Sequence, residues 1–126
     1  MIGVSLAGGL GNYLFQISAA YSFALDNNDT LIIDESKAVT VHKHMSTYKT
    51  NIFRNLNYGL VFYENYYQEP FFHYKEIPTI KNLFINGYFQ SEKYFSKHRE
   101  KLLSLFSIDN FNKNLLEKKY NNIDFE

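Results

Sequence analysis

The stretch that decides the fold is residues 1–34, MIGVSLAGGLGNYLFQISAAYSFALDNNDTLIID. Its apolar start, residues 2–6, predicts a short buried strand, and the Gly8-Gly9 pair predicts a tight turn after it. A helix free of proline and glycine should run from Asn12, followed by a β-branched strand over residues 30–34. The order of strand, glycine loop, helix and strand predicts a βαβ unit with a right-handed crossover.

The predicted helix has the sequence features of an amphipathic element with a defined start. Asn12 is a residue type that favours the N-cap position, where its side chain would accept a backbone hydrogen bond. The polar run 26–29 predicts the end of the helix. Five apolar side chains recur at helical spacing and should form the buried stripe: Leu14, Ile17, Tyr21, Ala24 and Leu25.

The remainder of the chain gives a weaker pattern in its middle and a clearer one afterwards. Aromatic residues interrupt polar positions throughout 35–78, where we predict a short helix over 49–56 and a strand over 60–63. A strand should follow over 83–89.

An amphipathic helix should then run from Ser91 to Phe106. Residues 115–120 form a further helical candidate in an Asn- and Lys-rich tail. At 126 residues, the chain has the length of one domain, so we predict a single domain over residues 1–126.

Charge and composition exclude several classes of protein. The 13 basic and 13 acidic side chains cancel, which argues against a nucleic-acid or membrane-surface partner. There is no cysteine, so disulfides and thiolate metal sites are ruled out. His42 and His44 alternate as strand ligands would, but no third ligand is spaced to complete a metal site. Neither a signal peptide nor an apolar run of about 18 residues is present, which predicts a cytoplasmic location.

The glycine loop admits three interpretations. Three glycines before a helix allow close approach of a ligand, and the unpaired N–H groups of the helix N-terminus suit an anion such as a diphosphate. Alternatively, the glycines only form a tight turn. In the third interpretation, Gly9 and Gly11 begin a dinucleotide-binding fingerprint and Asp34 binds a ribose, but Leu14 stands where the last glycine is required.

Three blocks of sequence carry a resemblance to a known family. Residues 8–16, GGLGNYLFQ, are similar to the opening motif G-G-L-G-N-Q-x-F-Q of the alpha-1,2-fucosyltransferases, glycosyltransferase family 11. Residues 87–95, GYFQSEKYF, resemble the central segment of that family, and residues 69–74, EPFFHY, resemble a stretch between the two. Their order and spacing also fit, so the resemblance covers the chain from residue 1 to about residue 106.

The resemblance implies an α/β fold, a Rossmann-like three-layer domain corresponding to the N-terminal half of a GT-B glycosyltransferase. It implies metal-independent, inverting transfer of L-fucose from GDP-fucose to a galactoside hydroxyl, without a cofactor. In the family, the loop residues would lie at the cleft between two halves. Gly9, Gly11 and Asn12 are therefore the candidate donor-binding residues. Asn12 has two open roles, as a helix cap or as a ligand contact.

Two departures from the family limit what the resemblance implies. Tyr13 stands where the motif has glutamine, and the family's H-x-R-R-G-D motif for the donor phosphates is absent, with Arg54 and Arg99 the only arginines. Losing one such charge typically costs about 10²- to 10³-fold in rate, so we expect the chain alone to be inactive. The alternative function is an inactive remnant or an acceptor-binding module. Expected partners are a galactose-containing acceptor and either a missing C-terminal half or a second copy of the chain.

The acceptor hydroxyl would also need a general base. The sequence offers five carboxylates by residue type alone, each of which is equally explained as a surface or capping group: Asp34, Glu35, Glu64, Glu69 and Glu92. Three roles are open for the aromatic side chains of residues 35–78. They would stack on sugar faces, pack in a core, or form an apolar surface for self-association.

Overall fold

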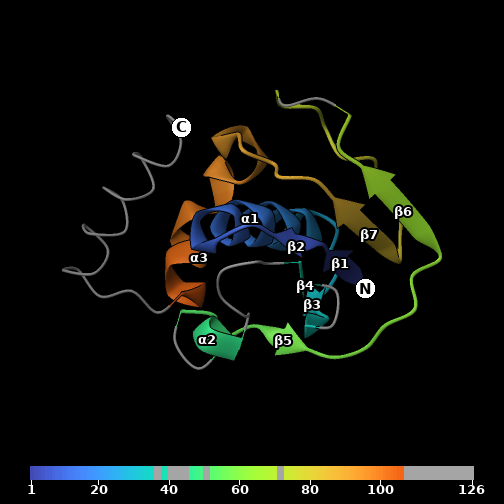
Figure 1. Cartoon of the computed structure of the whole chain (residues 1–126). Coiled ribbons are helices and arrows are strands. Elements are labelled where there is room, and N and C mark those ends of the chain that lie inside the picture. The colour runs from blue at the N-terminus through green and yellow to red at the C-terminus, as the bar shows by residue number, and fades with distance from the viewer. Residues whose placement is uncertain (36–37, 40–45, 50–51, 71–72, 107–126) are drawn as a thin grey trace.

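Short parallel strands pack against one side of a long helix in the computed structural model, which describes residues 1–35, 38–39, 46–49, 52–70 and 73–106 (Figure 1). The strands are β1 (Ile2–Val4), β2 (Leu6–Ala7), β3 (Ile32–Ile33), β4 (Ala38–Val39), β5 (Asn57–Tyr58), β6 (Asn65–Gln68) and β7 (Leu83–Asn86). The helices are α1 (Leu10–Asp26), α2 (Ser46–Lys49) and α3 (Arg99–Leu105), with 3₁₀ turns η2 (Glu92–Tyr94) and η3 (Ser96–His98) before α3. None of these helices is long and apolar enough to cross a membrane.

The strand pairing places β1 in the middle of the sheet. On one side β1 pairs in parallel with β7, with Ile2 opposite Leu83, and β6 pairs in parallel with the outer edge of β7. On the other side a parallel bridge joins Ile2 to Leu31, just before β3, and β3 pairs in parallel with β5. Strand β2 continues β1 and pairs in parallel with β4. This mixed α/β arrangement confirms the βαβ unit and is compatible with a Rossmann-like fold.

Helix α1 packs against β1 and β2 and starts earlier than the sequence predicts. Gly9 is the N-cap and accepts the Tyr13 N–H through its carbonyl at 3.1 Å. The prediction that Asn12 caps the helix is therefore wrong, because two residues of helix precede it. The prediction that α1 buries a single apolar stripe is also incomplete, because more of its surface is buried than one stripe. Residues 13–20 are all buried, since the sheet covers one side of the helix while η2 and aromatic side chains cover others.

The sheet face opposite α1 is covered by aromatic side chains of an irregular segment. Ile2 and Val4 point into the core with α1, so Gly3 points the other way. A side chain there would lie 2.5 Å from the ring of Tyr63, which also packs on Phe84 at 5.5 Å. Phe62 is 97% exposed in the same segment. A second helical layer, which a three-layer domain would have, stays a prediction. Self-association through exposed apolar side chains such as Phe62 also stays a prediction.

Several predicted elements of the middle region have different bounds or do not form. The helix expected over 49–56 is wrong, because α2 ends at Lys49 and residues 52–55 are turns. The strand expected over 60–63 is also wrong, because the β pairing lies on either side of it, in β5 and β6. The strand expected over 83–89 is confirmed as β7 but ends at Asn86.

The predicted helix from Ser91 to Phe106 is broken into η2, η3 and α3. Ser91 does cap the first turn, where its Oγ accepts the Lys93 N–H at 3.3 Å. Tyr94 and Phe95 are both buried, and two consecutive side chains of a regular helix point about 100° apart. At Phe95 the backbone leaves the helical region, with φ −144° and ψ 4°, and both rings are buried at the expense of helix continuity. The helix predicted over 115–120 lies outside the described residues.

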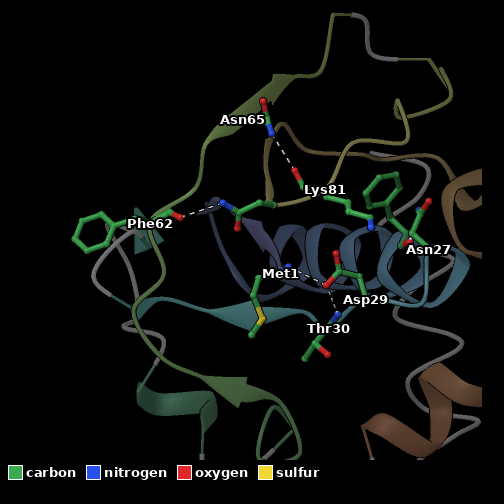
Figure 2. A network of polar contacts seen from close by, with 9 residues as sticks. Met1, Asn27, Asp29, Thr30, Phe62, Asn65 and Lys81 are labelled. Atoms are coloured by element: carbon green, nitrogen blue, oxygen red, sulfur yellow. Dashed lines mark hydrogen bonds and ion pairs between the residues drawn. The ribbon is translucent and has the colours of Figure 1, made fainter.

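Polar contacts fasten the amino ends of the strands together (Figure 2). The Met1 amino group lies 2.8 Å from Asp29 Oδ1, which also accepts the Thr30 N–H. Asn65 Nδ2 donates to Lys81 O at 2.9 Å, linking the start of β6 to the turn before β7. Burial raises the pKa of Asp29, but the hydrogen bonds from the Met1 amino group and Thr30 outweigh it, so that the pKa is lowered.

Tyr13 belongs to an aromatic cluster in the core. Its ring is fully buried and lies 6.2 Å from Tyr48 and 6.5 Å from Phe53, which in turn packs on Phe106 at 5.9 Å. Its hydroxyl is buried without a hydrogen-bond partner among the described residues. The phenol of Tyr13, which stands where the resembled motif has glutamine, is therefore directed into the core.

Removing the Tyr13 hydroxyl should leave the protein as stable or make it more stable. Tyr13→Phe relieves a buried unpaired group whose desolvation costs about 1–3 kcal/mol. Tyr13→Ala leaves a cavity and should cost about 3–5 kcal/mol. Urea unfolding measures both changes. A Phe variant more than about 1 kcal/mol less stable than the parent would mean that the hydroxyl does have a partner.

The end of α1 is tied to the turns before α3. Asp26 Oδ1 lies 2.7 Å from His98 Nε2 and 3.1 Å from Lys97 Nζ. Burial raises the pKa of Asp26, but the hydrogen bonds and charges of His98 and Lys97 outweigh burial and lower the pKa overall. The carboxylate therefore stabilises the folded chain only while it is ionised.

Asp26→Asn should destabilise the protein at pH 7 and not at low pH. Because the pKa of Asp26 is lower in the folded state, its contribution is complete above the unfolded value of about 3.8 and is lost as the pH falls through the folded value. The pair is partly exposed, so the expected cost at pH 7 is about 0.2–1 kcal/mol. Urea unfolding at pH 7 and pH 3 tests this, with Glu64→Gln as a control on an exposed carboxylate. An equal cost at both pH values would contradict the assignment.

Candidate functional site

A cavity of about 360 Å³ opens at the carboxyl ends of three parallel strands. It lies where β1 has β7 on one side and β3 on the other, the topological switch point at which parallel α/β sheets bind ligands. The lining comes from the ends of β2, β6 and β7 and from α1: Ala7, Gln16, Gln68, Glu69, Pro70, Asn86, Gly87 and Tyr88.

Gln16 fastens the two central strands at this edge of the sheet. Its Oε1 accepts the Ala7 N–H at 3.1 Å, and its Nε2 donates to Gly87 O at 3.0 Å. The side chain comes from α1 and is 1% exposed, and both bonds are partly buried. One buried amide thus sets the distance between the glycine loop and the end of β7.

Glu69 holds the turn that follows β7. Its Oε1 accepts the N–H groups of Tyr88 at 3.0 Å and Phe89 at 3.2 Å. A side chain at Gly87 would lie 2.5 Å from Glu69 Cβ, which explains the glycine. Phe89 has a φ of +50°, a conformation that bulky residues rarely adopt, and its ring is fully buried.

Tyr94 supports Glu69 from behind. Its hydroxyl lies 3.5 Å from Glu69 Oε2 and accepts the Lys75 N–H at 3.1 Å. Burial, with a smaller contribution from the Glu69 charge, raises the pKa of Tyr94, and the same two causes raise the pKa of Tyr67. Both phenols therefore stay neutral at physiological pH, and the Tyr94 hydroxyl acts as a hydrogen-bonding group, whereas the Tyr67 hydroxyl is buried without a partner among the described residues.

One pair of amide side chains lines the cavity, and a second pair joins the glycine-loop end of α1 to the segment after β7. Asn86 Nδ2 donates to Gln68 Oε1 at 2.7 Å, across the ends of β7 and β6. Gln90 Nε2 donates to Asn12 Oδ1 at 2.9 Å, so the first turn of α1 is joined to the segment after β7. These amides are exposed or half-exposed and present both donors and acceptors.

The predicted donor-binding residues lie beside this cavity and do not line it. Gly9 is exposed, and Gly11 and Asn12 are half-exposed on the first turn of α1. The glycine that the backbone requires is Gly8, whose φ is +87° and whose position would bring any side chain against the Asn12 amide. The tight turn predicted at the Gly8-Gly9 pair therefore depends on Gly8, whereas Gly9 and Gly11 are the donor-binding candidates.

The charge of the cavity is negative. Its described lining contains one carboxylate, Glu69, and no lysine, arginine or histidine. Neither Arg54 nor Arg99 is among these residues. Such a lining repels a diphosphate and suits a neutral ligand rich in hydroxyl groups.

Of the five carboxylates considered as a general base, Glu69 alone lines the cavity. Its Oε1 is occupied by two backbone N–H groups, which makes Glu69 a positioning residue for the turn 87–89. Glu35 instead forms an ion pair with Lys49 at 2.5 Å.

Within the part of the chain that the structure describes, no three His, Cys, Asp or Glu side chains are grouped to hold a metal ion. His42 and His44 lie outside those residues.

Sequence reasoning missed the roles of Gln16 and Glu69, although both residues lie in the quoted motif blocks. The available signal for Gln16 was a large polar residue in an otherwise apolar helical run. For Glu69 the signal was weaker, since nothing local indicates that it meets residues 88 and 89. That contact depends on the pairing of β6 with β7.

Comparison with known proteins yields one informative similarity. The chain is 30% identical over 143 aligned positions to the O-antigen biosynthesis glycosyltransferase WbnK of Escherichia coli. The alignment covers 82% of this chain and 47% of that protein, so the chain spans about half the length of its curated relative. No family model matches the chain, and no solved structure matches it. The similarity supports a relationship to glycosyltransferases.

Replacing Gln16 by leucine should loosen the edge of the sheet that carries the cavity. The variant keeps the apolar volume but leaves the Ala7 N–H and the Gly87 carbonyl without their partner, which costs about 1–3 kcal/mol. Urea unfolding gives the change in free energy. Gln90→Leu is the matched control, because it removes only the exposed hydrogen bond to Asn12, and exposed substitutions of this kind stay within about 0.5 kcal/mol. Equal effects of the two variants would show that Gln16 is not the fastening residue.

Proposed function

We propose that this chain forms part of a glycosyltransferase that transfers L-fucose from GDP-fucose to a galactoside hydroxyl, with inversion and without a metal. The observation that carries the proposal is the convergence of three motif blocks on one cavity. Residues 8–16, 69–74 and 87–95 are far apart in sequence, and contacts of Gln16 and Glu69 join them. The relationship to an O-antigen glycosyltransferase supports saccharide transfer as the reaction class.

The cavity is proposed to hold the acceptor galactoside. Sugar hydroxyls both donate and accept hydrogen bonds, and the paired amides of Asn86 and Gln68 offer both functions. Tyr88, 40% exposed at the rim, gives a ring against which a sugar face can pack. The negative charge of Glu69 disfavours a phosphate in the same place but tolerates a neutral sugar.

The donor is proposed to face the adjacent glycine loop. Gly9, Gly11 and Asn12 would contact the diphosphate or the fucose through backbone N–H groups at the start of α1 and through the Asn12 amide. Charge neutralisation of the departing GDP would come from residues outside this cavity, because its lining supplies no cation.

A second candidate function is acceptor binding without transfer by this chain alone. It is favoured by the same absence of a cation among the described cavity residues. In that case the chain should bind a galactoside but not GDP-fucose. The two candidates therefore differ in donor binding and agree in acceptor binding.

Lactose, as a galactose-containing probe, should bind at the cavity of the full chain. In a ¹⁵N NMR titration we expect the amides of Gly87 and Tyr88 to shift with lactose concentration. Asn86→Ala removes one hydrogen-bonding group at the rim and should weaken binding about 5- to 10-fold, equivalent to ~1–1.5 kcal/mol. Asn65→Ala is the matched control, because it alters the same residue type at the opposite, amino end of β6.

GDP-fucose distinguishes transfer from acceptor binding in the same preparation. A rise in melting temperature with GDP-fucose that is lost in Asn12→Ala supports a donor contact by the glycine loop. Lactose binding without any donor effect supports the acceptor-binding function of the chain alone. Absence of lactose shifts at Gly87 and Tyr88 would count against the proposed acceptor cavity.

A further inference from the structure

A second groove, of about 510 Å³, lies toward the other end of α1 from the glycine loop. It is bordered by the last turns of α1, by the segment before β7, and by η2 and η3. The lining mixes aromatic, charged and polar side chains: Ala19, Phe23, Asp26, Asn27, Tyr74, Glu76, Ile77, Thr79, Lys93, Tyr94, Ser96 and Lys97. No residue of this groove lines the first cavity.

Tyr74 provides a supported aromatic surface in this groove. Its side chain is 39% exposed, while its ring lies 4.8 Å from that of Tyr94. Tyr94 is buried and held on its other side by Phe89, at 5.2 Å in an edge-on arrangement. A tyrosine backed in this way loses little conformational entropy when a ligand packs on it.

The charged groups of the groove are balanced in sign. The Asp26 carboxylate is paired with Lys97 and His98. Glu76 and Lys93 are exposed and form no ion pair among the described residues. A balanced set of donors and acceptors does not select an anion or a cation. It matches a neutral ligand with hydroxyl groups.

We propose that this groove is a second saccharide-binding subsite, in which a sugar ring packs on Tyr74 and its hydroxyls bond to Glu76 and Lys93. The choice of a saccharide rests on the function proposed for the first cavity. A neutral polyol with one apolar face satisfies both the exposed ring and the balanced polar groups, whereas an apolar peptide would leave the charges of Glu76 and Lys93 desolvated.

Tyr94 connects the two sites physically. Its ring forms part of the groove, while its hydroxyl lies 3.5 Å from Glu69 Oε2 in the first cavity. Glu69 in turn holds the backbone of Tyr88 and Phe89. An occupied groove therefore contacts the same structural unit that shapes the cavity.

The lactose titration of the full chain tests the subsite through a separate set of signals. We expect the amides of Lys93, Ser96 and Lys97 to shift with lactose, and Asn86→Ala, which alters only the first cavity, should leave these shifts unchanged. Tyr74→Ala should weaken the groove response at least about fivefold, and Tyr74→Phe should preserve it, because the ring and not the hydroxyl provides the packing surface. Tyr66→Ala is the matched control, since Tyr66 is 69% exposed and lines neither site.

The outcomes separate this proposal from the previous one. Shifts at both sets of amides, with only the groove set lost in Tyr74→Ala, support the subsite. Shifts confined to Gly87 and Tyr88 overturn the subsite and leave the proposed function intact. Shifts confined to the groove support the subsite and contradict the acceptor cavity. A groove response that Tyr74→Ala leaves unchanged overturns the role of the ring, and no response at either site overturns both proposals.

Discussion

The parallel pairing of β7 with β1 is the constraint on which the site depends. It sets Ile2 opposite Leu83, and so brings together segments separated by most of the described chain. The hydrogen bonds between the parallel strands fix their register. The ends of the strands need additional contacts to hold them in place. Gln16 makes such a contact, because its one side chain bonds the backbone at the ends of both β2 and β7. The position of the cavity follows from these two interactions together.

This arrangement separates two chemically different surfaces that lie next to each other. The first turn of α1 presents backbone N–H groups, which favour negative charge. The cavity beside it is lined by amides and the carboxylate of Glu69. The Gln90–Asn12 bond joins the two surfaces at 2.9 Å. The diphosphate donor and the neutral acceptor that we propose have opposite electrostatic requirements, and neighbouring surfaces of this kind would meet both without placing phosphate beside carboxylate.

The sequence predicts the elements whose signal is local and fails where the signal depends on tertiary contacts. The first strand, α1, β3 and β7 follow from apolar runs and glycine positions, and the structure confirms them. The irregular segment after β5 could not be predicted, because its position depends on contacts with residues distant in sequence. Its Tyr63 ring packs over Gly3 and on Phe84. The same holds for the break at Phe95, where burial of adjacent rings outweighs helix propensity.

For the site, residues of all three motif blocks meet at one cavity, and the donor-binding role of the glycine loop beside it stays a prediction. Gly9, Gly11 and Asn12 stand out in sequence because a glycine loop before a helix is a familiar pattern. Gln16 and Glu69, which line the cavity, bond to backbone that is distant in sequence, and a single sequence does not indicate which backbone groups those partners are.

The strained backbone at Phe89 shows that the cavity is shaped by the protein itself. A left-handed conformation at a bulky residue costs about 1–3 kcal/mol and persists only where its surroundings stabilise it. Here the ring of Phe89 is fully buried against Tyr94, and its N–H donates to a carboxylate, so burial and a charge-assisted hydrogen bond offset the strain. Because all of these partners belong to the chain, the turn 87–89 holds its form before any ligand arrives. A ligand that enters the cavity then does not bear the entropic cost of ordering this wall, which is the condition for binding a flexible, strongly hydrated sugar.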